Sequence, residues 1–87
     1  MSFRYKRGID LDYNEQGRIY FHCLAYQTLS RREQEKIRRV CDQAGGEYAP
    51  ALLEFLTTEQ GYTAVCMKHH ISTNTLYRAV KRFYETF

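Results

Sequence analysis

The segment from Tyr62 to Phe87 constrains the fold more than any other part of the sequence. Apolar residues recur through its second half with helical spacing, which predicts a helix over Thr73–Phe87 with one buried face. A shorter helix is predicted over Tyr62–His69, and only His70-Ile71-Ser72 separate the two. Two amphipathic helices joined by so short a turn must cross each other closely.

The residues around this turn meet the steric requirements of a close crossing. Cys66 is small enough to lie where the second helix crosses the first, and Ile71 is placed to fill the corner. Ser72 is expected to cap the second helix by accepting a hydrogen bond from the amide of Asn74 or Thr75. The other inward positions are Val65, Leu76, Ala79, Val80, Phe83 and Phe87. The pattern predicts a helix-turn-helix.

The outward face of the second helix carries side chains that suit double-stranded DNA. An arginine can bind guanine O6 and N7 through two hydrogen bonds, and an asparagine can pair with adenine N6 and N7. Hydroxyl and cationic side chains suit phosphate oxygens. The candidate DNA-binding residues are Lys68, Ser72, Thr73, Asn74, Tyr77, Arg78, Lys81 and Arg82. The sequence therefore predicts sequence-specific DNA binding with helix 73–87 in the major groove.

The charge distribution permits a nucleic-acid partner without requiring one. The net charge is +3 and the pI is about 8.8, which is only mildly basic. Basic residues gather at Arg4–Arg7, at Arg31–Arg39 and at Lys68–Arg82, whereas Asp42–Glu59 is acidic. Because charge is segregated along the chain, one face of the folded protein is expected to be basic.

Two more helices are predicted in the middle of the chain. Ser30 and Glu33 have the spacing of a capping box, in which each side chain accepts a hydrogen bond from the other's amide. The apolar stripe of this helix is Ile37, Val40, Cys41 and Ala44. Gly45-Gly46 ends the helix, and Pro50 suits the first turn of the next one. That next helix is apolar nearly all round, so it is expected to be the most buried.

The N-terminal region is less clearly patterned. Residues 1–15 are basic, then acidic, and are predicted to form an arm that is disordered or that reaches a DNA minor groove. A helix is expected from about Gln16 or Arg18 to Thr28, and a hairpin through Asn14–Gly17 is the alternative. Residues 16–87 then form one all-α domain of four to five short helices. Its predicted core is Ile37, Val40, Leu52, Leu53, Leu56, Val65, Ile71, Leu76, Val80 and Phe83.

The runs Leu52–Thr58 and Tyr62–Tyr84 resemble small helix-turn-helix proteins encoded on bacterial mobile elements, such as prophages and conjugative transposons. They are also similar to the fourth region of sigma factors. The resemblance covers about Leu29–Phe87, and His70 departs from it because the turn residue is usually glycine. The resemblance implies DNA binding and control of transcription or of element mobility. RNA polymerase and a second copy of the chain are further candidate partners. A homodimer is compatible with DNA binding because paired half-sites often require one.

Other chemistries are not predicted. Cys23, Cys41 and Cys66 are too widely spaced for a disulfide framework, which favours a reducing, cytoplasmic location. Cys66, His69 and His70 lie together at one helix end, but His22, Cys23 and Cys41 are far away in sequence with no ligand-pair spacing, so no metal or cofactor is expected. The sequence contains no phosphate-binding glycine loop, nucleophile elbow or paired carboxylates, and we therefore expect no enzyme. No run reaches transmembrane length, so no membrane partner is expected.

A second hypothesis is a helical protein-interaction module that docks on a polymerase or on another mobile-element protein. The modest net charge motivates it, together with Tyr84 and Phe87, which are expected to stay partly exposed. A helix 73–87 covered by its own chain or by a partner favours this hypothesis. An exposed helix with a basic surface favours DNA binding.

Overall fold

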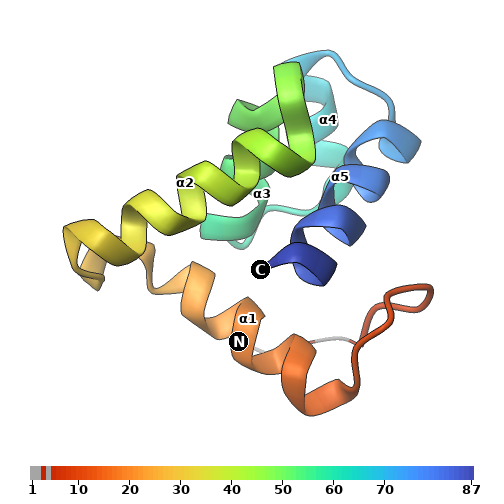
Figure 1. The fold of residues 1–87 in the computed structure, drawn as a ribbon. Helices are drawn as coiled ribbons and strands as arrows, with labels where there is room; N and C mark the ends of the chain where they lie inside the picture. The colour runs from red at the N-terminus through yellow and green to blue at the C-terminus, as the bar shows by residue number, and fades with distance from the viewer. Residues whose placement is uncertain (1–2, 4) are drawn as a thin grey trace.

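The structure is a computed structural model that describes residue 3 and residues 5–87. Every regular element in this part of the chain is helical, which confirms the predicted all-α class (Figure 1). The α-helices are α1 (Tyr13–Leu24), α2 (Arg31–Gly45), α3 (Ala49–Thr57), α4 (Tyr62–His69) and α5 (Thr73–Thr86). Two short 3₁₀ turns, η1 (Tyr26–Thr28) and η2 (Gly46–Tyr48), precede α2 and α3. Arg4 of the predicted basic arm lies outside the described residues.

The start of α1 is fixed by a capping box. The Asp12 carboxylate accepts a hydrogen bond from the Glu15 amide at 2.8 Å, and the Glu15 carboxylate accepts one from the Asp12 amide at 3.4 Å. Both otherwise unpaired amides are thereby satisfied. The helix therefore begins at Tyr13, directly after this pair.

This start corrects two predictions for the N-terminal third. The expected start at Gln16 or Arg18 is too late, because those residues already lie within α1. The alternative hairpin through Asn14–Gly17 is wrong, since these residues form the first turns of the helix. The regular helix also ends earlier, at Leu24, and the residues up to Thr28 continue as η1.

The starts of α2 and α3 agree with the sequence, but only one of the two hydrogen bonds of the predicted Ser30–Glu33 capping box is formed. The Ser30 hydroxyl accepts a hydrogen bond from the Glu33 amide at 3.2 Å and caps α2. Beyond the end of α2, Gly46 takes a φ of 55°, a conformation that glycine adopts without steric cost. Pro50 lies in the first turn of α3 and is the one exposed residue of that helix. α3 is thus as enclosed as expected.

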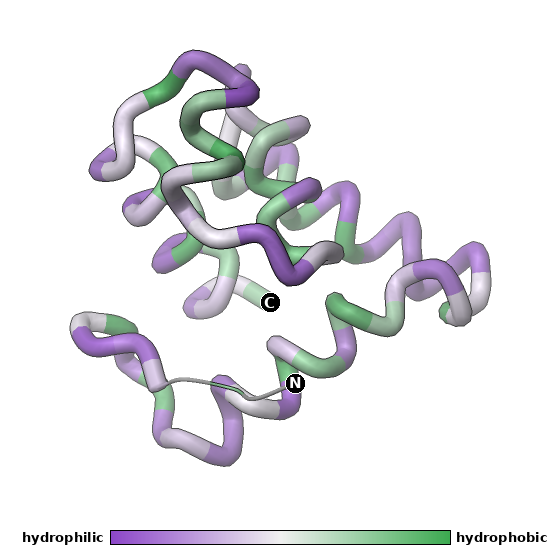
Figure 2. The backbone as a smooth tube through the Cα atoms, turned by 180° about the vertical axis from the view of Figure 1, so that it is seen from behind, coloured by the Kyte–Doolittle hydropathy of each residue, from purple (hydrophilic) through white to green (hydrophobic). Residues whose placement is uncertain are grey.

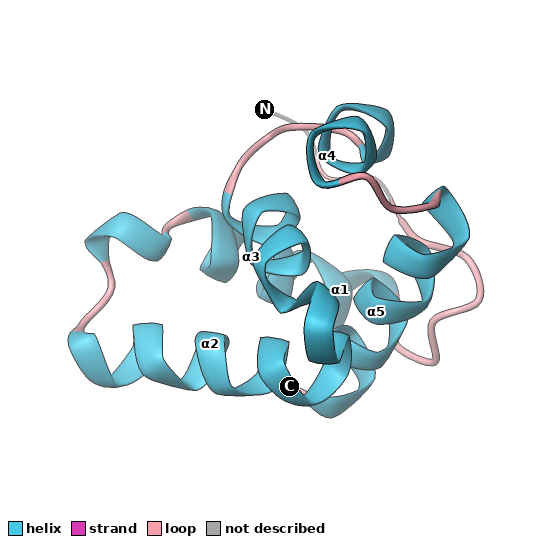
Figure 3. Cartoon of the chain, turned by 90° about the horizontal axis from the view of Figure 1, so that it is seen from above, coloured by secondary structure: helices cyan, strands magenta, loops and turns pink. Residues whose placement is uncertain are grey.

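The helices pack around α3 and the inner faces of α2 and α5. α2 packs against both α3 and α5, and α4 packs against the same two helices. α1 contacts α3 and lies below the other helices in Figure 1. Figure 3 shows α3 between α2 and α4. Hydrophilic and hydrophobic residues alternate along the helices, as one-sided burial requires (Figure 2).

The core is largely the predicted one. Eight of the ten predicted core residues are buried, namely Ile37, Val40, Leu52, Leu56, Val65, Leu76, Val80 and Phe83. Leu53 on α3 is only half-buried. Ile71, in the turn before α5, is also half-buried. Tyr84, which the sequence placed partly in solvent, is 2 % exposed.

No helix in the described part of the chain is long and apolar enough to cross a membrane.

Residues 5–12, the described segment directly before α1, are packed onto the helices, contrary to the expectation of a disordered arm. Ile9 is 4 % exposed and joins the core. The buried Gln16 side chain accepts a hydrogen bond from the Lys6 amide at 2.8 Å and donates to the Lys6 and Leu11 carbonyls at 3.1 Å. The segment therefore belongs to the same folded unit as the helices, and the predicted boundary at residue 16 falls inside α1.

Candidate nucleic-acid interface

The turn between α4 and α5 has the geometry that the sequence predicts. His70 adopts the left-handed conformation with φ 57° and ψ 46°, the conformation usually taken by glycine at this place. The Ile71 amide donates to the Cys66 carbonyl at 3.1 Å, which ends α4. His70 therefore replaces the usual glycine without changing the conformation of the turn.

Ser72 caps α5 through the second of its two expected partners. Its hydroxyl oxygen accepts a hydrogen bond from the Thr75 amide at 3.1 Å. The Ser72 and Thr75 hydroxyls also lie 2.8 Å apart and share a hydrogen bond. Because both hydrogen bonds are made within the protein, the main role of the Ser72 hydroxyl is to cap α5.

The contact between α4 and α5 is made by the predicted inward residues. Val65 and Leu76 are fully buried, and Cys66 and Ala79 are 7 % and 1 % exposed. The small Cys66 and Ala79 side chains allow the two helices to approach, while Ile71 covers the corner from the turn. The orientation of α5 is thus set by packing on one side, which leaves its other side facing outward.

Three of the predicted DNA-binding residues point to solvent with no side-chain partner in the described part of the chain. Thr73, Asn74 and Arg78 are all exposed. Asn74 and Arg78 are four residues apart, so their side chains lie one above the other on the same face of α5. With Thr73, they are the exposed residues of the candidate interface for which the described residues supply no side-chain partner.

Farther along α5, the predicted cationic residues have partners within the protein. Lys81 Nζ lies 2.8 Å from a Glu85 carboxylate oxygen, and this hydrogen bond raises the pKa of Lys81 and lowers that of Glu85. Arg82 Nε donates to the Ala44 carbonyl at 2.8 Å and ties α5 to the last turn of α2. Arg82 is therefore a structural residue as well as an exposed cation, which its sequence position does not reveal.

Lys68 also has an internal partner, on α3. Its ammonium lies 3.2 Å from a Glu54 carboxylate oxygen that also lies 3.0 Å from His69 Nε2. The Glu54 side chain is 17 % exposed. The hydrogen bond from His69, followed by the contacts with Lys68, lowers the pKa of Glu54 against the opposing effect of burial. This cluster fixes the end of α4 on α3 and so supports the turn.

Tyr77 joins α5 to the N-terminal segment. Its hydroxyl donates to the Arg7 carbonyl at 2.6 Å across a sequence separation of 70 residues. Gly8 has a φ of +82°, and a Cβ placed on it would lie 2.7 Å from the Tyr77 hydroxyl oxygen. The segment can lie this close only because residue 8 is glycine. Tyr77 thus positions the segment beside α5 and leaves Arg7 exposed there.

Lys6, another residue of the predicted basic arm, is withdrawn from solvent. Its ammonium lies 5.7–5.9 Å from the ring centroids of four aromatic side chains, Phe3, Tyr20, Phe55 and Tyr84. Burial lowers the pKa of Lys6. Such contacts attract the cation through the ring faces. Lys6 therefore anchors the segment and is not presented to a ligand.

The cysteines are placed as core residues. Cys23, Cys41 and Cys66 are all buried with free thiols. Burial raises the pKa of Cys23 and of Cys41 to about 12, so neither is a thiolate at neutral pH. The described residues contain no group of three or more Cys, His, Asp or Glu side chains placed to hold a metal ion.

Comparisons with known proteins assign no family to the chain. No protein-family model matches it. Searches of curated proteins and of solved structures likewise found no match.

Proposed function

We propose that the protein binds double-stranded DNA through the exposed face of α5. The observation that carries the proposal is the pair Asn74 and Arg78, exposed one helical turn apart on a helix whose other side packs against α2, α4 and α3. The B-DNA major groove is wide enough to admit such a helix. In this arrangement Arg78 reads guanine and Asn74 reads adenine.

The surrounding residues suit contacts to the DNA backbone. Thr73, at the start of α5, is exposed and can donate to a phosphate oxygen. Lys81 and Lys68 are salt-bridged to carboxylates, so a phosphate has to compete with Glu85 or Glu54 for them. The exposure of Asn74 and Arg78, which have no internal partner among the described residues, supports base contacts by the first turns of α5.

A regulatory role follows from the resemblance noted in the sequence. Small helix-turn-helix proteins of bacterial mobile elements control transcription or element mobility, and we propose a role of this kind. RNA polymerase, or a second copy of the chain on a paired half-site, is the additional partner that this role implies.

Selection of bound duplexes from a random pool, followed by fluorescence anisotropy on the selected site, tests the proposal. Arg78→Ala should weaken binding to the selected site by about 1–3 kcal/mol and relax base preference at one position. Lys81→Ala should weaken binding on all sequences and reduce the salt slope by about one unit. The matched control is Arg39→Ala, an exposed arginine on α2, which should change neither.

Two results would contradict DNA binding. If the protein shows no salt-sensitive affinity for any duplex at low ionic strength, the proposal fails. Equal losses for Arg78→Ala and Arg39→Ala would also contradict it, because they would show general charge attraction without a reading helix.

Docking on another protein is a second candidate, favoured by one observation. Tyr13 and Phe21 on α1 are 57 % and 46 % exposed, so both present aromatic surface to solvent. Such residues are enriched in protein interfaces. Phe21→Ser should abolish capture of a purified polymerase or element protein and leave duplex binding unchanged if this face is the docking surface.

A further inference from the structure

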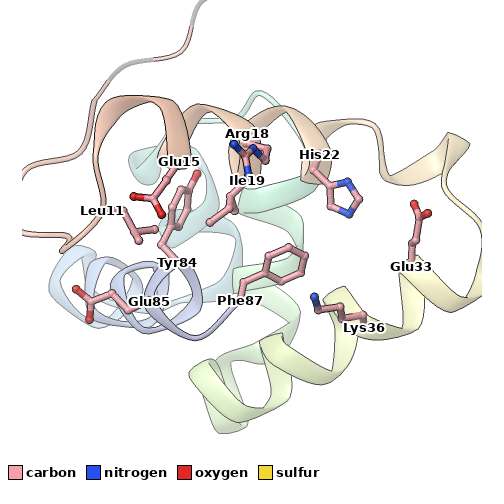
Figure 4. A pocket seen from close by; sticks show the side chains of 10 residues that line it. All are labelled: Leu11, Glu15, Arg18, Ile19, His22, Glu33, Lys36, Tyr84, Glu85 and Phe87. Atoms are coloured by element: carbon pink, nitrogen blue, oxygen red, sulfur yellow. The ribbon is translucent and has the colours of Figure 1, made fainter.

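The N-terminal segment runs along one flank of α5 and is bonded to the helix at two points. The Tyr77 hydroxyl donates to the Arg7 carbonyl at 2.6 Å, and the Asp10 amide donates to a Glu85 carboxylate oxygen at 3.0 Å. Figure 4 shows Leu11, the next residue, beside the last turn of α5. The segment and the helix therefore lie side by side, and Arg7 is at the end nearer the turn.

The backbone on both sides of Arg7 is fixed, whereas its side chain is exposed. The Lys6 main chain forms two hydrogen bonds with the Gln16 side chain, at 2.8 Å and 3.1 Å. On the other side, Gly8 packs against the Tyr77 hydroxyl with a φ of +82°. The Arg7 side chain has no hydrogen-bond or ion-pair partner among residue 3 and residues 5–87. Its guanidinium is therefore available to a ligand on a backbone that is already ordered.

Tyr77 places Arg7 beside the candidate base-reading face and not on it. Successive residues of an α-helix are about 100° apart, so Tyr77 projects to the side of the face that carries Asn74 and Arg78. A helix with its side chains is about 10–12 Å across, and the major groove of B-DNA is about 12 Å wide. A helix in the groove therefore has a sugar-phosphate backbone along each flank, and Arg7 lies on one of these flanks.

The charge near the first turns of α5 favours a phosphate. The sequence has no Asp or Glu in residues 62–84, which form α4, the turn and most of α5, and none in residues 5–9. Glu54 on α3 contacts the end of α4, but it is already paired with Lys68 and His69. Arg7 thus adds a cation to a surface with few competing acids.

The opposite end of α5 is more acidic. Asp10 lies there, because its amide is bonded to Glu85. Three carboxylates and two cations line the cleft at this end, namely Glu15, Glu33, Glu85, Arg18 and Lys36 (Figure 4). A DNA strand is therefore attracted to the first turns of α5 more than to its last turn, and Arg7 lies at the favoured end.

We infer that Arg7 contacts a DNA phosphate beside the groove that α5 enters, and that Tyr77 is its positioning residue. The inference rests on the proposed DNA binding and adds a contact from outside the helix-turn-helix. A guanidinium binds phosphate oxygens through its planar fork. Because the backbone of Arg7 is held before binding, less conformational entropy is lost when the contact forms. The Tyr77 hydroxyl already donates within the protein, to Arg7.

The salt dependence of binding to the selected duplex measures this contact. Arg7→Gln should weaken binding about fivefold, the upper figure for one exposed charge contact. The slope of log affinity against log salt should fall by about one, because one fewer phosphate is neutralised, and base preference should not change. Arg7→Lys should retain the slope, since it keeps the charge. Arg39→Gln removes the same charge from the exposed side of α2 and should change neither quantity.

A double-mutant cycle separates positioning by Tyr77 from a phosphate contact of its own. Tyr77→Phe keeps the ring and removes the hydroxyl that donates to the Arg7 carbonyl. If Tyr77 acts through Arg7, then Arg7→Gln should cost less than about twofold in the Tyr77→Phe background. If the Tyr77 hydroxyl binds a phosphate independently, the two losses should add. Thermal denaturation of each variant verifies that the fold is retained.

Three results would overturn the inference while DNA binding by α5 stands, as judged by a specific loss for Arg78→Ala. The first is an Arg7→Gln protein with unchanged affinity and salt slope. The second is an equal loss for Arg7→Gln and Arg39→Gln, which would show general charge attraction. The third is additive losses in the cycle, which would exclude Tyr77 as the positioning residue. A protein without salt-sensitive binding to any duplex would refute the proposed function itself, and with it this contact.

Discussion

The α4–turn–α5 region and the N-terminal segment with α1 differ in what holds them in place. The first is set by contacts between near neighbours in sequence, such as the Ile71 amide on the Cys66 carbonyl. The second depends on distant partners: the Asp10 amide donates to Glu85 at 3.0 Å across 75 residues. Both regions are well packed. The turn of the first region is set by its own residues, whereas Lys68, His69 and Arg82 tie its two helices to α3 and α2.

α5 presents one face to solvent and is contacted on another flank by the N-terminal segment. Its first turns, with Asn74 and Arg78, are exposed. Between them, on another face of the helix, the Tyr77 hydroxyl donates to the Arg7 carbonyl, and nearer the end of α5 Glu85 accepts from the Asp10 amide. The N-terminal segment thus lies along one flank of the helix and limits the surface available to a ligand. The N-terminal segment, which the sequence predicted to be a separate arm, therefore borders the candidate interface.

The largest expected effect comes from breaking the local region. Leu76 is fully buried beneath the α4–α5 crossing, and Leu76→Ala should lower the free energy of unfolding by about 2–5 kcal/mol. The loss combines the transfer free energy of the removed side-chain atoms with the free-energy cost of the cavity that they leave. Urea denaturation followed by circular dichroism measures it.

Met67 supplies a matched control for that substitution. It lies on α4 and is 72 % exposed, so Met67→Ala should change the free energy of unfolding by less than about 0.5 kcal/mol. Comparable losses at the two positions would contradict the packing described for α4 and α5.

The next effect concerns the N-terminal region. Gln16→Ala should cost about 1–3 kcal/mol, because the Lys6 amide and the Lys6 and Leu11 carbonyls lose their side-chain partner. Hydrogen exchange at the Lys6 amide should accelerate at the same time. Gln43→Ala, on the exposed face of α2, is the control. Unchanged exchange at Lys6 would show that the segment is held without Gln16.

The sequence predicted well wherever the cause is local. The Ser72 cap, the left-handed His70 and the buried Leu76 follow from spacing within a few residues, and the structure contains all three. The Asp12–Glu15 box that begins α1 is also local, and it is a detectable signal that the predicted helix start does not use. The error there is one of interpretation and not of missing information.

The remaining differences have long-range causes. Nothing near Tyr77 in sequence indicates that its hydroxyl donates to Arg7, and nothing near Arg82 indicates its bond to Ala44. Likewise, Lys6 looks like a solvent-exposed cation until four aromatic rings from separate elements surround it. Such pairings depend on how the helices pack, so single-residue patterns cannot supply them.

A smaller effect, of opposite sign, tests the turn itself. His70 has a φ of 57°, a conformation that strains residues with a Cβ. His70→Gly should therefore raise the free energy of unfolding by about 0.5–1 kcal/mol, and His70→Val should lower it. Thermal denaturation measures both. A destabilising glycine would show that the His70 side chain makes a contact worth more than the strain.

The smallest effect concerns the support of α4 by α3, and it depends on pH. The pKa of Glu54 is lowered in the folded protein, chiefly by His69 and then by Lys68. A lowered folded pKa means that the carboxylate stabilises the fold above its unfolded pKa of about 4.3 and loses this contribution as the pH falls through the folded value. Glu54→Gln should thus cost under about 1 kcal/mol at pH 7.

The pH dependence separates this charge effect from a change of packing. The difference in free energy of unfolding between the natural protein and Glu54→Gln should shrink as the pH is lowered from neutral to about 3, below the ordinary glutamate pKa. Urea denaturation at a series of pH values measures it. Glu47→Gln, at an exposed glutamate in η2, should show no such trend. A constant difference at Glu54 would mean that its carboxylate is not stabilised by His69 and Lys68, and that α4 is held on α3 by apolar contacts alone.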